Sequence, residues 1–274
     1  MVQRITIDPS QISTDSIRLE SDQSHYLSRV LRLGAGDRFI AQDGLGHQWS
    51  AILTERPDLA QIVEVLSTTS TPLPPLRLIA ALPKGNGFDA VIRQTTELGV
   101  THIYPVTTER TLLKPSVNKV ARWNRIAKEA SEQSERITVP EIAEPMPFRN
   151  CLAMLQPERS VAPSIASPVA QTMTQTAQKP SALYFICAAR AADKKSNNHL
   201  LSRLLTHQQH FLSSEKLPSI TIAIGPEGGW TTDEITVATT YDYEVVSLGS
   251  VILRAVTAPI TALSLVAGAR ELLI

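Results

Sequence analysis

The sequence predicts an α/β protein in which a small β-rich segment precedes a larger domain built on a parallel sheet. Residues 1–66 contain short β-like runs broken by turn signals, whereas apolar strands alternate with helical patterns after residue 76. Between them, Thr68–Pro75 carries three prolines within four positions, which neither a helix nor a central strand accepts. We therefore place a domain boundary in this proline-rich segment.

The β-rich segment contains two clear strand candidates, residues 38–41 and 48–53. Glycines at positions 34 and 36 precede the first strand, and the turn signal Asp43–Gly44, followed by Gly46, separates the two. This pattern predicts a small β domain.

Helical and strand periods alternate in the larger domain. Phe88, Val91 and Ile92 recur at helical spacing, and Gly99 suits the C-terminal cap of that helix. We expect further helices at about residues 118–134 and 258–273. Residues 156–181 are rich in Ser, Thr, Ala, Gln and Pro and lack an apolar face, so we expect a surface insertion there. The expected strands are residues 78–82, 102–106, 183–187, 220–224 and 245–248.

Composition narrows the functional class. The 274 residues carry 26 basic and 26 acidic side chains, and this zero net charge argues against a protein that coats nucleic acid by bulk electrostatics. Cys151 and Cys187 lie far apart, and His207 and His210 have no nearby ligands at metal spacing, so we expect no disulfide and no metal. The N-terminus lacks a signal pattern, and no apolar run approaches the ~18 residues that a membrane span requires. We expect a cytoplasmic protein without membrane contact.

A glycine-rich turn follows the expected strand 220–224. Gly225, Pro226, Gly228 and Gly229 stand before a helix that Thr231 and Glu234 would begin with a capping box. The GxxxxGK[ST] and GxGxxG phosphate patterns are absent, and acidic residues occupy the first helical turn. The turn therefore favours a pocket for an uncharged purine or a small zwitterion, unless it is only a tight strand-to-helix connection.

A second junction of the same kind lies at Ser247–Ala258. It leaves a strand, turns at Gly249, carries Arg254 and enters a helix whose Pro259 suits the first turn. Because ligands bind at the carboxyl ends of parallel strands, the two loops can form one pocket.

Four motifs, LPKGNGFDAVIRQTTELGV, EQSER, IGPEGGW and LGSVILRAVTA, together resemble those of the 16S ribosomal RNA uridine N3-methyltransferase family, which belongs to the SPOUT methyltransferases. HYLSRVLRLGAGD and the DGLG turn are similar to that family's PUA-like RNA-binding β-barrel. The resemblance implies a PUA-like domain at residues 1–70 and a SPOUT domain at residues 76–274, with a deep trefoil knot in its C-terminal part.

The resemblance also implies a cofactor and a set of residues that hold it. In the family, the IGPEGG loop and the LG-x-x-ILR-x-x-TA loop wrap S-adenosylmethionine, largely through backbone contacts, at a homodimer interface. The glycines would then let the main chain approach a bent cofactor. By similarity, the cofactor residues are Ile224, Gly225, Pro226, Gly228, Leu248, Gly249, Ile252, Leu253, Arg254 and Thr257.

The second loop departs from the family pattern. Ser250, Val251, Ala255 and Val256 stand where the family usually has proline, arginine, threonine and glutamate. Two alternatives therefore stay open beside methylation of a 16S uridine. One is a catalytically weakened RNA-binding or ribosome-assembly protein on the same fold, and the other is a methyltransferase for another RNA.

Methylation at uracil N3 requires an unpaired or flipped base, loss of the N3 proton and stabilisation of negative charge on the ring oxygens. We expect Arg254 to be the catalytic stabiliser; the alternative is an ion pair with a neighbouring helix. Glu132 and Arg136 can face the pocket, but we expect a structural role for Glu132. For Trp230, core packing is favoured over a place above the pocket. The residues do not identify a general base.

Basic side chains indicate where 16S ribosomal RNA or the 30S subunit could bind. Charged runs are often only solvated faces, but the family resemblance favours phosphate contacts. The candidates are His25, Arg29, Arg32, Lys84, Arg110, Lys114, Arg122 and Arg125.

Overall fold

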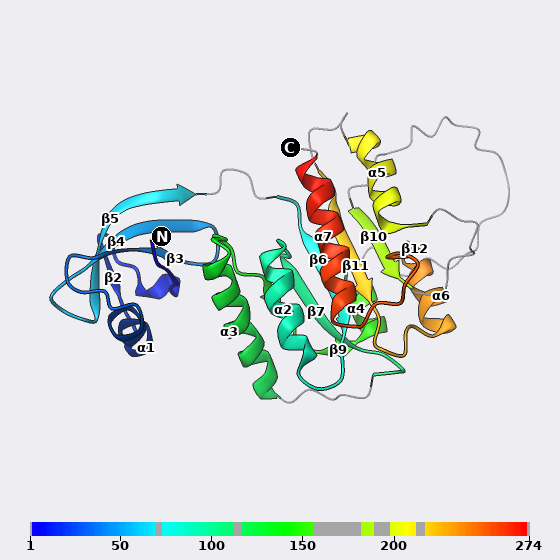
Figure 1. Cartoon of the computed structure of the whole chain (residues 1–274), viewed down its shortest axis with the longest axis horizontal. Helices are drawn as coiled ribbons and strands as arrows, with labels where there is room; N and C mark the ends of the chain where they lie inside the picture. Colours follow the sequence, from blue (N-terminus) through cyan, green and yellow to red (C-terminus); the bar gives the residue numbers. More distant parts are fainter. Residues whose placement is uncertain are drawn as a thin grey trace, which may run out of the picture. The chain divides into compact units, whose positions relative to one another are not determined.

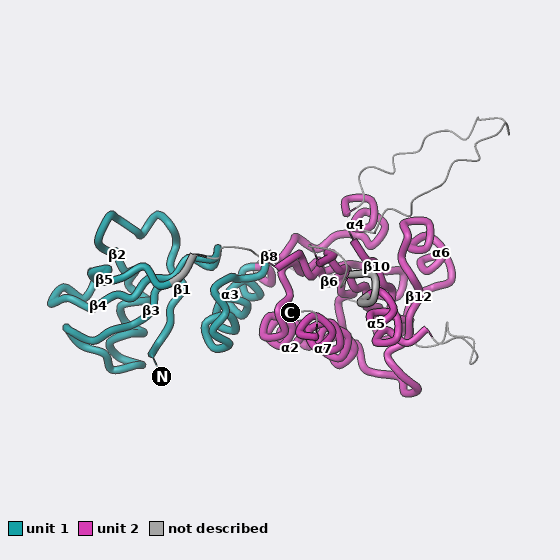
Figure 2. Tube along the Cα trace, turned by 90° about the horizontal axis from the view of Figure 1, so that it is seen from above, with its two compact units in different colours: residues 1–72, 121–140 teal, residues 73–120, 141–274 magenta. Residues whose placement is uncertain are grey.

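The computed structural model describes residues 2–68, 73–111, 117–155, 182–188, 198–211 and 217–272. They form two compact units (Figure 2): unit 1 comprises Met1–Pro72 and Ala121–Pro140, and unit 2 comprises Leu73–Val120 and Glu141–Ile274. Residues 121–140 thus pack with the N-terminal segment, although the expected division placed them in the C-terminal domain. The expected insertion at residues 156–181 lies outside the described residues.

Unit 1 is built on a curled five-stranded sheet whose strand order is β1-β3-β4-β5-β2. Among its described strands, only the β1–β3 pair is parallel, and β5 pairs with both β4 and β2. Phe39, Ile17 and Leu27 belong to its buried core. The expected strands at 38–41 and 48–53 are confirmed. The strands are β1 (Arg4–Thr6), β2 (Ser16–Arg18), β3 (Arg38–Gln42), β4 (His47–Leu53) and β5 (Leu59–Thr68).

The turn between β3 and β4 uses the residues that the sequence indicated. Gly44 and Gly46 have φ angles of 72° and 114°, in the left-handed region that favours glycine. The Asp43 carboxylate accepts the backbone N–H of Leu45 at 2.7 Å and that of His47 at 3.1 Å. Asp43 therefore holds the turn through its side chain.

Helical segments complete unit 1. The π-helical turn η2 (Tyr26–Val30) follows α1 (Ser21–His25), and a short 3-10 turn, η1, spans Pro9–Gln11. The long helix α3 (Val117–Gln133) lies mostly in this unit, and its Trp123 is fully buried.

Glu132 fastens the end of α3 to β1, which agrees with the structural role expected for it. Its carboxylate accepts the backbone N–H of Thr6 at 2.6 Å, and Arg4 pairs with Glu135 at 2.8 Å beside it. Burial raises the pKa of the Glu132 carboxyl above its ordinary value, and the hydrogen bond from Thr6 opposes that rise only in part.

The raised pKa predicts a pH dependence of stability. The folded state keeps the Glu132 proton to a higher pH than the unfolded chain does, so the free energy of unfolding falls as pH rises from the unfolded pKa through the folded one. We expect Glu132→Gln to remove this fall, because the amide oxygen still accepts the Thr6 N–H. Urea denaturation between about pH 4 and pH 8 measures the effect. The exposed Glu64→Gln in the same unit is the control, and an unchanged slope in Glu132→Gln would contradict the assignment.

Unit 2 contains a seven-stranded sheet in which every pairing is parallel. The order is β12-β10-β11-β6-β7-β8, and β9 also pairs with β7. Its central strands are nearly continuous apolar runs, as strands covered on both faces require. The predicted parallel α/β sheet is confirmed. The strands are β6 (Leu76–Ala81), β7 (His102–Thr107), β8 (Glu141–Ile142), β9 (Met146–Pro147), β10 (Ala182–Cys187), β11 (Ser219–Ile224) and β12 (Glu244–Val246).

Helices cover both faces of this sheet (Figures 1 and 2). Helices α2, α5 and α7 pack together on one face, and α4 and α6 pack on the other. The helices expected near 88–98, 118–134 and 258–273 are confirmed. The trefoil knot stays a prediction. The helices of unit 2 are α2 (Gly87–Glu97), α4 (Phe148–Leu155), α5 (Leu200–Phe211), α6 (Thr232–Thr240) and α7 (Thr257–Glu271).

Candidate cofactor site

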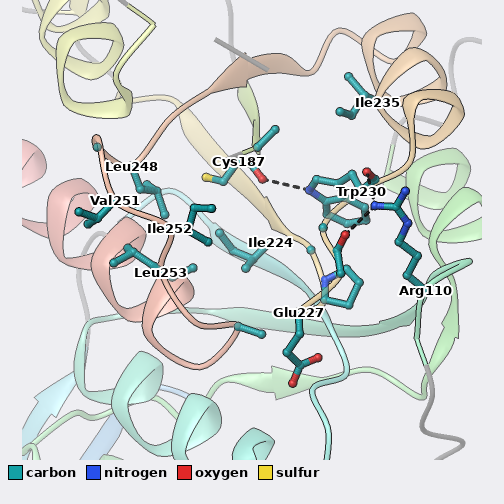
Figure 3. A pocket seen from close by; sticks show the side chains of 18 of the residues that line it. Arg110, Cys187, Ile224, Glu227, Trp230, Ile235, Leu248, Val251, Ile252 and Leu253 are labelled. Atoms are coloured by element: carbon teal, nitrogen blue, oxygen red, sulfur yellow. Dashed lines mark hydrogen bonds between the residues drawn. The ribbon is translucent and has the colours of Figure 1, made fainter. Parts of the chain in front are cut away.

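The two glycine-bearing loops line one cavity in unit 2. One loop follows β11 and the other follows β12; only β10 separates these strands in the sheet, and all three run in the same direction. Their carboxyl ends therefore open on the same edge. The cavity has a volume of about 620 Å³ and takes further lining from Cys187 and Ala188 at the end of β10. Figure 3 shows Leu248, Ile252 and Leu253 on one side and Trp230 on the other.

Most of the residues expected from the family resemblance lie here. Arg254 and Thr257 are not among the lining residues; Arg254 is exposed, and its carbonyl accepts the N–H groups of Thr257 and Ala258 at the start of α7. The cofactor roles themselves stay predictions. The expected residues that line the cavity are Ile224, Gly225, Pro226, Gly228, Leu248, Gly249, Ile252 and Leu253.

Trp230 is the neighbour that Gly225 accommodates. A Cβ on Gly225 would lie 3.1 to 3.2 Å from three atoms of the indole ring, closer than side chains normally pack. The ring packs on Phe148 with centroids 4.4 Å apart, and its Nε1 donates to the Cys187 carbonyl at 3.1 Å. Trp230 is thus a core residue, as expected, and it also forms a wall of the cavity.

Gly249 and residues 251–253 of the loop after β12 line the cavity. Gly249 has a φ of 131°, a backbone conformation that residues with a side chain rarely adopt. Among the described residues, no main-chain hydrogen bond involves residues 249–253. Val251 and Ile252 are also 67% and 65% exposed. This loop can therefore offer N–H and C=O groups, with aliphatic side chains beside them, to a ligand.

The capping box at the start of α6 is confirmed. Thr231 Oγ1 accepts the Glu234 N–H at 3.2 Å, and Glu234 Oε2 accepts the Thr231 N–H at 2.9 Å. With Asp233 in the same turn, this helix end already carries negative charge. The geometry agrees with the expectation of an uncharged or zwitterionic ligand rather than a phosphate.

The cavity offers no activated thiol. Burial raises the pKa of the Cys187 and Cys151 thiols to about 12, so both stay protonated near neutral pH, and both are free. No group of three or more metal-ligating side chains occurs in the described part of the chain. His207 lies 4.0 Å from Glu244, and the His210 side chain is outside the described residues.

The expected RNA-binding residues divide between the units. His25, Arg29 and Arg32 are exposed on and after α1 and η2 of unit 1, and Arg122 and Arg125 are exposed on α3. Lys84 is exposed in unit 2, whereas Lys114 lies outside the described residues. Arg110 is the exception, because its side chain contacts the glycine-rich loop after β11, which we call the cofactor loop.

Sequence reasoning missed several cavity residues. Arg110, Cys187 and Glu227 come from three different strand ends, and no motif connects them. Glu227 had one available signal, its place between the two glycine-bearing halves of the turn.

Comparison with known proteins identifies the class. A protein-family model described as an RNA methyltransferase domain matches residues 69–157 and 151–267. A second model, described as an RNA methyltransferase PUA domain, matches residues 19–65. The fold and cavity described above are thus those of an RNA methyltransferase with a PUA domain.

Individual relatives narrow the class to one family. Ribosomal RNA small subunit methyltransferase E of Synechocystis sp. is 40% identical over 266 residues, 96% of this chain and 77% of that protein. The Rickettsia conorii protein of that name is 30% identical over 275 residues, 95% and 93% of the two chains. The Neisseria gonorrhoeae enzyme, solved bound to S-adenosyl methionine, superposes with a TM-score of 0.70 at 26% identity and covers 96% of both chains. The chain belongs to the ribosomal RNA small subunit methyltransferase E family.

Proposed function

We propose that the protein transfers a methyl group from S-adenosylmethionine to N3 of a uridine in 16S ribosomal RNA. The observation that carries this proposal is the single cavity that both glycine-bearing loops line. Family membership supports it, as does the gonococcal relative that was solved with this cofactor. As the family resemblance implies, the proposal includes a cytoplasmic homodimer. Separately, no helix in the described part of the chain is both long and apolar enough to cross a membrane.

The cavity residues fit this cofactor. A volume of about 620 Å³ lies within the usual range for small-molecule pockets. Ile224, Leu248 and Leu253 offer apolar contacts for an adenine ring, and the unpaired peptide groups of residues 249–253 suit its polar edge or an amino acid group. When bound, S-adenosylmethionine would supply a sulfonium methyl group, so the remaining task of the chain is to position the reacting base.

Arg254 is our proposed catalytic residue. It is exposed, and its guanidinium forms no hydrogen bond or ion pair with any residue that the structure describes. The alternative of an ion pair with a neighbouring helix therefore has no support in the described structure. A free guanidinium in the loop after β12 can stabilise charge on uracil O2 or O4 as N3 loses its proton.

Val256 stands where the family usually has glutamate, but this position does not line the cavity. A Cβ on Gly87 would lie 2.8 Å from Val256 Cγ2, so this side chain packs on the start of α2. Val256 is not a lining residue of the cavity. This packing supports an intact site despite the departure from the family pattern.

We further propose that unit 1 supplies the RNA contacts and that residues 76–274 carry the methyltransferase site. Residues 1–70 are the proposed PUA-like domain. Because residues 121–140 pack with them, Arg122 and Arg125 belong to the same proposed RNA-binding unit as Arg29 and Arg32. Lys84 and Lys114 stay candidates for the RNA path.

Methyl transfer to undermodified 30S subunits and to free 16S ribosomal RNA tests the function. We expect a radiolabelled methyl group in the RNA and 3-methyluridine as the modified nucleoside in mass spectrometry. Cofactor binding without transfer would instead favour a ribosome-assembly role. Transfer to transfer RNA or 23S RNA alone would show that the substrate is wrong.

A further inference from the structure

The loop after β7 is fastened to the glycine-rich cofactor loop by Arg110. Its Nη1 donates to the carbonyl of Gly228 at 2.6 Å and lies 3.4 Å from the carbonyl of Trp230 (Figure 3). These two acceptors lie 118 and 120 residues further along the chain. One guanidinium thus holds two carbonyls of the loop that lines the cavity.

The stem of Arg110 explains the glycine at position 228. A Cβ on Gly228 would lie 3.1 Å from Arg110 Cδ and 3.3 Å from its Cβ. The aliphatic part of the arginine therefore lies directly against the peptide backbone of Gly228. The contact combines packing with charge-assisted hydrogen bonds.

A buried carboxylate makes a second connection between the same two loops. Glu234 is 3% exposed; its Oε1 accepts the N–H of Glu109 at 3.0 Å, while its Oε2 accepts the N–H of Thr231. Glu227, in the glycine-rich loop itself, contacts a third loop: its Oε1 accepts the N–H of Lys84 at 2.9 Å. Two neighbouring loops therefore contact the glycine-rich loop and the start of α6 through side chains bonded to main chain.

We infer that Arg110 is a positioning residue of the cofactor loop and acts through Gly228 and Trp230. A loop with three glycines loses much conformational freedom when it is ordered, so its bound shape needs external support. Arg110 and Glu234 supply that support before any ligand arrives. The inference rests on the proposed function for the identity of the ligand, and it assigns Arg110 to the cofactor loop rather than to RNA phosphates.

Two substitutions at position 110 separate packing from hydrogen bonding. Arg110→Met keeps an aliphatic stem against Gly228 but removes both hydrogen bonds, and Arg110→Lys keeps the charge with a single ammonium group. The control is Arg149→Met, an exposed arginine of α4 in unit 2. Calorimetry would measure the dissociation constant for S-adenosylmethionine. Hydrogen exchange of ligand-free protein would measure the order of residues 224–231.

We expect Arg110→Met to weaken S-adenosylmethionine binding about 10-fold, as loss of a charge-assisted hydrogen bond predicts. The loop amides should exchange faster even without ligand. Arg110→Lys should recover part of both effects, and the KM for RNA should stay within about twofold of wild type. Arg149→Met should match the wild type in every measurement.

The opposite pattern would overturn the inference. Unchanged cofactor affinity and unchanged exchange, with a higher KM for RNA and a salt slope reduced by about 1, would make Arg110 a phosphate contact. If wild-type protein binds no S-adenosylmethionine, the proposed function fails. The exchange measurement still tests whether Arg110 orders the loop through Gly228 and Trp230. If Arg110→Met does not fold, Gly228→Ala tests the same contact, because its methyl group displaces the Arg110 stem; unchanged loop exchange in that variant would also contradict the inference.

Discussion

Gly225→Val should abolish measurable cofactor binding and destabilise unit 2 by about 1 to 3 kcal/mol. A Cβ at this position already lies 3.1 Å from the Trp230 ring. The ring cannot easily retreat, because Phe148 packs on it and the Cys187 carbonyl accepts its Nε1. Valine would therefore displace either the indole or the loop main chain. Thermal unfolding and calorimetry with S-adenosylmethionine would measure the two effects.

Gly268→Ala is the matched control for Gly225→Val. Gly268 lies in α7 of the same unit, and a Cβ there would meet nothing within 4 Å. We expect this variant to bind the cofactor normally and to gain up to about 1 kcal/mol of stability, because alanine favours the helix. Normal cofactor affinity in Gly225→Val would show that the close contact with Trp230 does not shape the site.

Arg254→Ala is expected to lower kcat by about 100-fold or more while leaving the dissociation constant for S-adenosylmethionine nearly unchanged. The side chain does not line the cavity and has no partner among the described residues, so its removal should cost little stability. Its proposed role, stabilising charge on the uracil oxygens, arises only as N3 loses its proton. Single-turnover methyl transfer to undermodified subunits, with calorimetry in parallel, would measure the two quantities.

The outcome at Arg254 has a clear alternative. A weaker cofactor affinity with an unchanged rate at saturating cofactor would place this arginine on the cofactor, as the family resemblance also allows. Arg254→Lys should retain part of the rate, because a positive charge remains near the ring oxygens. An unchanged rate in both variants would remove Arg254 from the mechanism.

The sheet of unit 2 could be predicted because its signals are local. Strands such as residues 220–224 are continuous apolar runs, and the α2 pattern with Gly99 marks a helix without any knowledge of its neighbours. The packing partner of α3 could not be predicted in this way. Its apolar face, with Trp123 and Ile126, only shows that some core covers it, and the contacts of Glu132 and Glu135 with β1 join residues 126 and 131 positions apart.

The site shows the same division between local and distant signals. The two loops were visible because glycines directly follow apolar strands, and the capping box of Thr231 and Glu234 spans only four residues. Arg110 carried no such signal. Its sequence neighbourhood is basic, which favoured RNA binding, whereas its partners Gly228 and Trp230 lie more than a hundred residues away. Only the folded sheet brings these strand ends together.

A crystal structure of the protein with S-adenosylmethionine tests the central claim most directly. We expect the ligand between the two loops, with main-chain atoms of both Gly225–Gly228 and Gly249–Leu253 within hydrogen-bonding distance of it. A ligand bound elsewhere, or held by side chains of one loop alone, would contradict the account.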